Sequence, residues 1–318
     1  MAGPILVTGA AGFAGSHLID LLAGDGRDVV AWHRQAALAR RNAISGRRPG
    51  VTVEAVDLLD PAAVRTAAAR VRPAVVYHLA GAAHVGESWT RTEATFATNV
   101  RATHHLLEAL RLAGAAPRFL VPSSATVYRS ADEPLTEDHP LIPESPYGVS
   151  KLAQELLASR AIADHIDVTI ARSFNHVGPR QDPSFVASSF ARQIAEIESG
   201  QRAAELCVGN LDARRDLSDV RDTVRAYAML VERGQRGRAY NVCTGRAVTV
   251  RELLDRLLAR ARTTIKVHVD PARYRPNDVP LVLGDPSRIQ REVGWTAEIP
   301  LDRTLDDLLE YWRGQITV

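Results

Sequence analysis

Tyr147 and Lys151 stand four residues apart in the segment Ser-Pro-Tyr-Gly-Val-Ser-Lys, a spacing that puts both side chains on one face of a helix. A free tyrosine has a pKa of about 10, so we expect a cation beside Tyr147 to draw its pKa down towards the working range of an acid or base. The chain has 39 basic residues, of which only Lys151 and Lys266 are lysine. A compact ammonium therefore stands here in a chain that uses arginine nearly everywhere else. We predict an acid–base pair, against the alternative of an exposed helical Tyr/Lys pair.

A glycine-rich turn near the N-terminus predicts what binds beside this pair. An apolar strand at 5–8 leads into a turn spaced G-x-x-G-x-x-G, and a helix over 16–23 and a strand over 28–32 follow. In such a βαβ unit, bare glycine backbone and a helix N-terminus receive a pyrophosphate. We therefore predict a dinucleotide site, with contacts from Gly9, Gly12, Phe13, Ala14 and Gly15.

The end of the second strand bears on which nicotinamide cofactor binds. An acid there would accept hydrogen bonds from a ribose 2′-hydroxyl, whereas an arginine accommodates a 2′-phosphate. The sequence has His33 and Arg34, with Arg40 and Arg41 close behind, and no acid at the strand end. We therefore favour NADP(H). NAD(H) remains the alternative, because Arg34 could be one of many surface arginines.

Strands and helices alternate over the first half of the chain, which predicts an α/β fold of Rossmann type with a doubly wound parallel sheet. Long helices are expected at 92–112 and 147–163. Chemistry gathers at the carboxyl ends of parallel strands, so Ser124 should meet Tyr147 there. His78 lies inside a predicted buried strand and is expected to be a hydrogen-bonded core residue. Neighbouring strand ends should line the cofactor through Asp57, Leu58, Leu79, Ala80 and Gly81.

The alternation weakens near residue 173, which predicts a domain boundary. We expect a cofactor domain over 1–172, to which the chain returns at about 216–243. A smaller α/β domain for the substrate is expected over 173–215 and 244–318.

Charge and composition narrow the class of protein. The net charge is only +2, so no global field points to nucleic acid or membrane as a partner. Two cysteines give no disulfide framework. The start of the chain does not resemble a signal peptide, and no apolar run approaches the length of a membrane span. We expect a cytoplasmic protein.

Three motifs resemble the extended short-chain dehydrogenase/reductase family. They are Thr-Gly-Ala-Ala-Gly-Phe-Ala-Gly at 8–15, Ser-Ser-Ala-Thr-Val-Tyr at 123–128 and the segment around Tyr147. The later half is similar to the GDP-mannose group of that family, at 174–181, 208–216 and 274–287. That group includes GDP-mannose 4,6-dehydratases and the reductases that make GDP-D-rhamnose, and the chain most resembles the reductases.

The resemblance implies roles for individual residues. Ser124, Tyr147 and Lys151 match the catalytic set, and Asn99 matches the asparagine that supports the active-site helix beside the cofactor. Arg215 and Arg275 match a pair that grips a diphosphate, to which charge-assisted hydrogen bonds are strong. No metal is implied. The residues implied to contact a GDP-linked sugar are His84, Thr126, Asn175, Arg180, Arg215, Arg275 and Asp278.

Thr126 stands where the family's dehydratases carry an acidic base, two positions after the catalytic Ser124. A hydroxyl without an activating partner is a poor base for a C–H proton, so elimination of water is disfavoured. The expected reaction is NADPH-dependent reduction of the 4-keto group of a GDP-6-deoxy-4-keto-hexose. The alternatives are an NDP-sugar 4-epimerase with tightly held nicotinamide, then GDP-mannose 4,6-dehydratase, and, from another class, a non-catalytic NADP(H) sensor. The family also implies a homodimer, in which the helices at 92–112 and 147–163 form a four-helix bundle.

Overall fold

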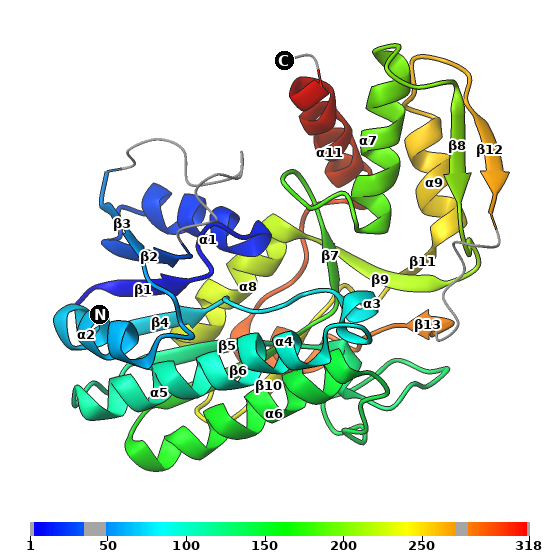
Figure 1. Ribbon diagram of the computed structural model, residues 1–318. Helices are drawn as coiled ribbons and strands as arrows, with labels where there is room; N and C mark the ends of the chain where they lie inside the picture. The colour runs from blue at the N-terminus through cyan, green and yellow to red at the C-terminus, as the bar shows by residue number, and fades with distance from the viewer. Residues whose placement is uncertain (1–2, 35–48, 271–278, 317–318) are drawn as a thin grey trace.

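The computed structural model describes residues 3–34, 49–270 and 279–316 (Figure 1). Arg40, Arg41, Arg275 and Asp278, which the sequence analysis places near the cofactor or the substrate, lie outside the described residues. The described chain forms a large sheet with helices on both faces and a smaller group of strands and helices to one side (Figure 1).

Seven parallel strands form the main sheet, in the order β10-β6-β5-β4-β1-β2-β3. They are β1 Ile5–Thr8, β2 Val29–His33, β3 Val51–Ala55, β4 Val75–His78, β5 Arg118–Ser124, β6 Asp167–Ser173 and β10 Ala239–Val242. The central strands β1 and β4 are buried throughout, as expected for parallel strands covered on both faces. The strand order reverses between β1 and β4, which is where doubly wound sheets bind ligands at their carboxyl edge. The predicted Rossmann-type fold is confirmed.

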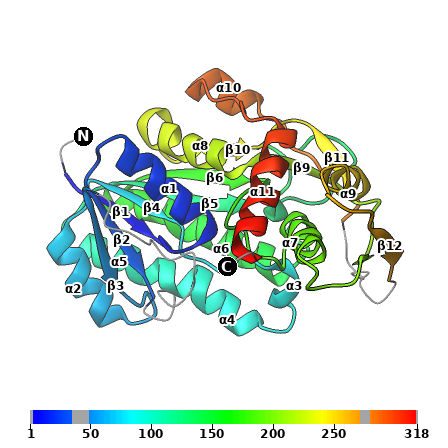
Figure 2. The ribbon, with the colours of Figure 1, turned by 90° about the horizontal axis from the view of Figure 1, so that it is seen from above.

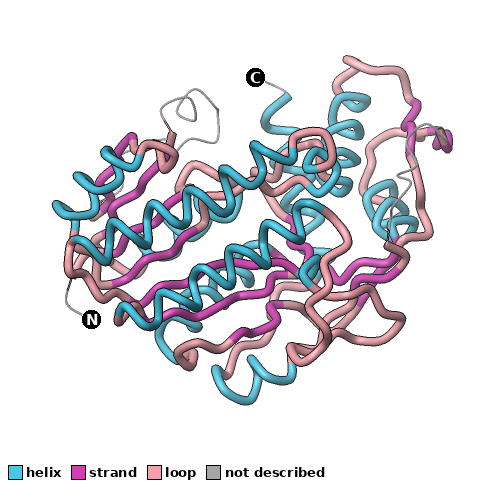
Figure 3. The backbone as a smooth tube through the Cα atoms, turned by 60° about the horizontal axis from the view of Figure 1, so that its bottom comes forward, coloured by secondary structure: helices cyan, strands magenta, loops and turns pink. Residues whose placement is uncertain are grey.

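Helices cover both faces of the sheet (Figure 2). One face packs against α1 Phe13–Gly24, α8 Val220–Arg233 and α10 Ser287–Val293. The other packs against α2 Pro61–Val71, α5 Ala102–Leu112 and α6 Pro146–Arg160. Each face has its own apolar core, with Tyr227 of α8 in the first and Leu106 of α5 in the second. Figure 3 shows α5 and α6 side by side over the sheet.

The helical run from 92 to 112 is not a single α-helix. α4 Thr92–Phe96 continues into a π-helical turn at Ala97–Arg101, which leads into α5. The prediction was correct in extent but missed this turn, which holds Asn99; π-turns are often found at functional sites. After α6, a 3-10 turn follows at Ala161–Asp164. Within the described ranges, no helix has both the length and the apolar character that crossing a bilayer requires.

The smaller part of the fold is built largely from the chain that follows β6 (Figure 1). β7 Asn175–Val177, β9 Arg214–Asp219, β11 Ala247–Thr249 and β13 Leu281–Val282 form one small sheet, and β8 Glu205–Val208 pairs with β12 Lys266–Val269. A third apolar core lies among α7 Val186–Glu198, α9 Val250–Leu258 and α11 Leu301–Ile316. Between these elements the chain returns to the main sheet, where β10 pairs with β6.

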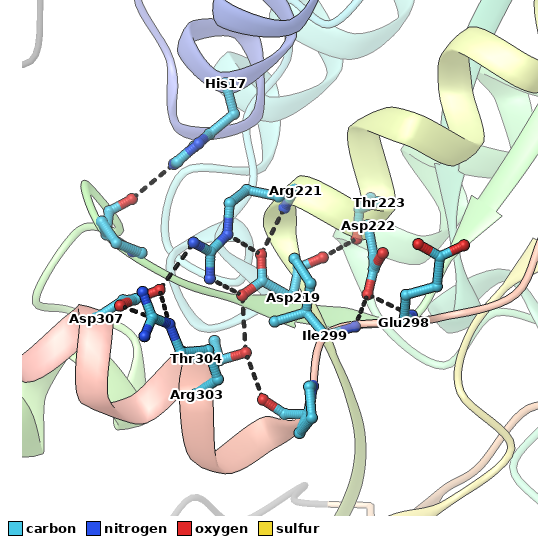
Figure 4. Close-up of polar contacts among 12 residues, drawn as sticks. His17, Asp219, Arg221, Asp222, Thr223, Glu298, Ile299, Arg303, Thr304 and Asp307 are labelled. Atoms are coloured by element: carbon cyan, nitrogen blue, oxygen red, sulfur yellow. Dashed lines mark hydrogen bonds and ion pairs between the residues drawn. The ribbon is translucent and has the colours of Figure 1, made fainter.

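A polar cluster joins the two parts (Figure 4). Asp219 caps α8 by accepting a hydrogen bond from Arg221 N at 2.7 Å, and it also accepts one from Thr304 Oγ1 of α11 at 2.7 Å. The Arg221 guanidinium pairs with Asp219 at 2.7 Å and with Asp307 of α11 at 2.8 Å. Because Asp219 is buried, these contacts fix α11 to the start of α8.

Candidate active site

The start of α6 fixes the position of Tyr147. Ser145 caps the helix by accepting a hydrogen bond from Gly148 N at 3.1 Å, which is typical of helix N-termini. Tyr147 N donates to Ser88 Oγ, also at 3.1 Å, so the helix start is tied to α3 Val85–Ser88. Lys151 follows one turn later on the same side of the helix.

Ser124 meets Tyr147 at the carboxyl end of β5. A hydrogen bond joins the two side chains. Ser124 Oγ also accepts hydrogen bonds from Thr126 N at 3.2 Å and from Thr126 Oγ1 at 3.0 Å. Since both contacts with Thr126 use its oxygen as acceptor, the Ser124 hydroxyl proton is left to point towards Tyr147. The structure therefore brings together the predicted residues Ser124, Tyr147 and Thr126.

The pKa of Tyr147 moves in the direction opposite to the one expected from its sequence. Burial raises the pKa to about 12, and the hydrogen bond with Ser124 opposes the rise. The prediction that the pKa of Tyr147 is drawn down towards neutrality is therefore wrong for this structure. The sequence could show the lysine one turn away but not how far water is excluded from the phenol. At neutral pH, Tyr147 carries its proton and is suited to donate it.

Lys151 is buried and held by two acceptors. Its Nζ donates to Pro122 O and to Gln154 Oε1, each at 2.5 Å. Burial lowers the pKa of Lys151 to about 8, and the nearby Glu155 carboxylate opposes this. Glu155 is itself paired with the buried Arg172 of β6 at 2.9 Å. Two of the three ammonium donors are thus engaged by described residues, which leaves one for a ligand.

The glycine turn has the shape of a pyrophosphate cradle. Gly9 has a positive φ of 65°, and its carbonyl oxygen accepts from Gly12 N at 2.9 Å. A Cβ atom on Gly15 would lie 2.2 Å from that oxygen, so only glycine permits this close packing. Phe13 and Ala14 begin α1, and no described side chain caps the helix. Its first N–H groups are therefore available to an anion, and the turn fits a dinucleotide.

The segment after β4 lies against the π-helical turn. Ala82 N donates to Asn99 Oδ1 at 2.8 Å, and Asn99 Nδ2 donates to Ser150 Oγ of α6 at 2.9 Å. A Cβ atom on Gly81 would lie 3.0 Å from Asn99 Oδ1. Asn99 therefore holds the predicted cofactor residues Leu79, Ala80 and Gly81 close to the active-site helix. The remaining predicted cofactor residues stand at neighbouring strand ends, with Arg34 after β2 and Asp57 and Leu58 after β3.

The residues predicted to bind the substrate lie on several different segments of the fold. His84 stacks on Phe185 with ring centroids 4.4 Å apart. Asn175 begins β7 with its side chain exposed, and Arg215 lies on β9, where its Nη1 donates to the carbonyl of Arg214.

Arg180 points towards α1. Its Nη2 donates to His17 Nδ1 and to Asp20 Oδ2, each at 2.7 Å. A role in substrate binding stays a prediction for His84, Asn175, Arg180 and Arg215.

Several residues that support the site were not predicted from the sequence. Gln154 holds Lys151, Ser88 holds Tyr147, and Gly148 permits α6 to approach Thr126. Only Gly148 left a local signal, because glycine inside a helix is unfavourable by about 1 kcal/mol unless something requires it. His78 is buried and hydrogen-bonded, as expected of a core histidine.

Comparison with known proteins places the chain in a family. A model of the family described as GDP-mannose 4,6 dehydratase matches residues 6–308. The chain is 35% identical to the GDP-6-deoxy-D-mannose reductase of Pseudomonas aeruginosa over 316 residues, or 98% of each chain. The structure of RMD from Pseudomonas aeruginosa complexed with NADPH is similar, with a TM-score of 0.85 and 33% identity over 99% of this chain and 100% of that one. So is the UDP-glucose 4-epimerase of Thermus thermophilus in complex with NAD, with a TM-score of 0.86 and 29% identity over 98% and 99%.

The residues that the family model matches include the glycine turn, Ser124 and the Tyr147/Lys151 pair. The two solved structures hold NADPH or NAD, which agrees with the cradle at the start of α1. The chain belongs to the GDP-mannose 4,6 dehydratase family of the extended short-chain dehydrogenases/reductases, which are NAD(P)-dependent enzymes that modify nucleotide sugars.

Proposed function

We propose that the protein is an NADPH-dependent 4-ketoreductase of a GDP-6-deoxy-4-keto-hexose. The observation that carries the proposal is the contact between Thr126 and Ser124. The Thr126 hydroxyl donates its proton to Ser124 Oγ at 3.0 Å, at the position where dehydratases of this family carry an acidic base. A neutral hydroxyl engaged in this way does not remove a proton from carbon. The site is therefore equipped for reduction without elimination of water.

The residues of the site divide the reaction between them. When bound, the nicotinamide would supply a hydride to C4 of the sugar. Tyr147 is protonated at neutral pH because burial raises its pKa to about 12, and it donates that proton to the developing alkoxide. With the sugar bound, the Ser124 hydroxyl would turn from Tyr147 to donate to the same oxygen, a contact that strengthens as negative charge develops. Lys151 uses its remaining donor to hold the nicotinamide ribose.

Three observations support NADP(H) as the cofactor. Arg34 follows β2 with an exposed side chain, where a guanidinium would pair with a 2′-phosphate. The nearby carboxylate of Glu54 is already engaged, by Trp32 Nε1 at 3.0 Å and by Arg70 at 2.7 Å. The similar structure from Pseudomonas aeruginosa contains NADPH. GDP as the nucleotide is supported by the family that the chain matches.

We also infer that the smaller part, over 173–215 and 244–318, binds the nucleotide sugar and that the protein is a homodimer. Large apolar side chains are exposed on both α5 and α6, with Leu156 at 64% and Leu112 at 55% of their full exposure. A second copy packed through the same two helices would cover them and would form a four-helix bundle.

The proposed activity is tested by following NADPH consumption with GDP-6-deoxy-4-keto-mannose. We expect one NADPH to be consumed for each sugar reduced, and we expect the Tyr147→Phe variant to lose most of the rate. A 4-epimerase would instead turn over an NDP-hexose without added cofactor. A non-catalytic sensor would bind NADPH without consuming it. Full activity in the Tyr147→Phe variant would overturn the mechanism.

A further inference from the structure

A chain of buried hydrogen bonds leads from Lys151 into the main sheet. Lys151 Nζ donates to Gln154 Oε1, and Gln154 Nε2 donates to Thr103 Oγ1 of α5 at 2.8 Å. His78 Nε2 lies 2.8 Å from the same threonine oxygen, and His78 Nδ1 lies 2.8 Å from Thr8 Oγ1 at the end of β1. All five side chains are buried. We refer to them as the Lys151–Thr8 chain.

The direction of each hydrogen bond in the Lys151–Thr8 chain follows from the donors available. The Thr103 hydroxyl donates to Asn99 O at 2.7 Å, so its oxygen can only accept from Gln154 and His78. His78 must then carry its proton on Nε2 and accept from Thr8 on Nδ1. Burial and the charge of Lys151 lower the pKa of His78 to about 3, which agrees with a neutral ring. The hydrogen bonds of the Lys151–Thr8 chain therefore hold its side chains in place and do not pass a proton along.

We propose that Gln154 is a positioning residue for Lys151, which anchors the ammonium through Thr103 and His78 to the ends of β1 and β4. With Pro122 O as the second acceptor, the side chain of Lys151 is held in one place. Its third donor would then be left for the cofactor. The expected effect of Gln154 on the reaction rate rests on the function proposed above. Its expected effect on cofactor binding does not.

Gln154 also bears on the charge of Lys151. The titratable groups that interact with the charge of Lys151 are Glu155 from α6 and His78 from β4, and Tyr147 lies one turn earlier on α6. Of these, only Glu155 favours the ammonium, and it shares its charge with Arg172. Burial lowers the pKa of Lys151 to about 8, so near that pH the balance between ammonium and amine depends on each acceptor. Removing the Gln154 oxygen should favour the amine.

Two substitutions at Gln154 test this in opposite directions. The alkaline limb of the pH profile of kcat/KM should move to lower pH in Gln154→Met, which removes an acceptor. It should move to higher pH in Gln154→Glu, which adds a negative charge. At pH 7.5 we expect kcat/KM of Gln154→Met to fall about tenfold, the equivalent of one hydrogen bond to a charged group. If both variants keep the wild-type limb, or if both limbs move the same way, the proposal is wrong.

A matched pair of threonine variants separates positioning from a general loss of packing. Thr103→Val removes the next hydrogen-bonding group of the Lys151–Thr8 chain. The alkaline limb of this variant should move in the same direction as that of Gln154→Met, but by a smaller amount. Thr169→Val changes a buried threonine of β6 outside the chain and should leave the limb unchanged. If Gln154→Met does not fold, the other two variants still test the proposal. The alkaline limb should move to higher pH in Gln154→Glu and to lower pH in Thr103→Val. Equal limbs in those two variants would refute the proposal.

Cofactor binding keeps this test independent of the sugar. NADPH fluorescence should show that binding weakens above about pH 8 in the wild type, because the amine replaces the ammonium, and at lower pH in Gln154→Met. If the wild type binds NADPH but reduces no 4-keto sugar, the proposed function fails while this titration still tests Gln154. Identical binding profiles in the wild type and Gln154→Met would overturn the positioning role.

Discussion

Gly148 lies so close to Thr126 that a Cβ atom on the glycine would fall 2.4 Å from the threonine carbonyl oxygen. This approach lets the first turn of α6 pack directly on the 3-10 turn Ala125–Val127 that follows β5. Tyr147 on α6 and Ser124, which ends β5 directly before the turn, can therefore share a hydrogen bond. Gly148 builds the site although it carries no reactive group.

Gly148→Ala should lower kcat by at least about tenfold, since displacement of reacting groups by about 1 Å can cost a hundredfold. The added methyl forces α6 away from Thr126 and separates Tyr147 from Ser124. Steady-state rates together with NADPH titration would show a loss of rate larger than the loss of cofactor affinity. Gly314→Ala on α11, where a Cβ atom meets nothing within 4 Å, is the control and should leave the rate unchanged. Wild-type kcat in Gly148→Ala would show that the close approach is not needed.

Features of the site that depend on local pattern could be predicted from the sequence. The turn from Gly9 to Gly15 follows a strand and opens a helix, and parallel strands direct their ends to one edge. The meeting of Ser124 with Tyr147 follows from that geometry, although the two are distant in sequence. Position on a strand or helix was therefore enough to predict that these two side chains lie together.

Features that depend on distances across the fold could not be predicted in this way. The rise in the pKa of Tyr147 comes from burial by several segments. The contact of Gln154 with Thr103 joins two helices 51 residues apart in sequence. Arg180 adopts a positive φ of 72° and contacts α1, which no local motif indicated. Each of these features depends on how separate helices and strands pack together, and not on the local sequence of any one of them.

The protein should lose stability on acidification through its buried histidines. Burial lowers the pKa of His17 to about 4 and that of His78 to about 3, whereas unfolded histidine titrates near about 6.5. The stability linked to these lowered values is present above about pH 6.5 and is lost as the pH falls towards the folded pKa. Between pH 6 and 5, each such histidine should lower the free energy of unfolding by up to about 1.4 kcal/mol per pH unit.

His17→Gln tests this because glutamine can still accept the hydrogen bond from Arg180 but does not titrate. Urea unfolding between pH 6 and 5 should give a slope that is smaller by about 1 kcal/mol per pH unit than in the wild type. His268→Gln, at an exposed position of β12, should keep the wild-type slope. If His17→Gln and the wild type have equal slopes, His17 is not the group that titrates.

Arg34→Ala should change the preference between cofactors. Loss of one charge-assisted contact with a 2′-phosphate should weaken NADPH binding by about tenfold, while NADH binding stays the same. Titrating both cofactors against wild type and variant measures the ratio directly. Arg251→Ala, another exposed arginine, should leave both affinities unchanged. An equal loss for NADPH and NADH would mean that Arg34 does not read the 2′-position.

Leu156→Glu should break the proposed dimer. Leu156 is exposed on α6, and a carboxylate at the centre of a four-helix interface would be buried against its symmetry mate without a partner. Light scattering coupled to size exclusion should give a dimer mass for the wild type and a monomer mass for the variant. Val267→Glu, on the distant strand β12 where the side chain is 37% exposed, should remain dimeric. A wild-type monomer, or a Leu156→Glu variant that stays dimeric, would rule out association through α5 and α6.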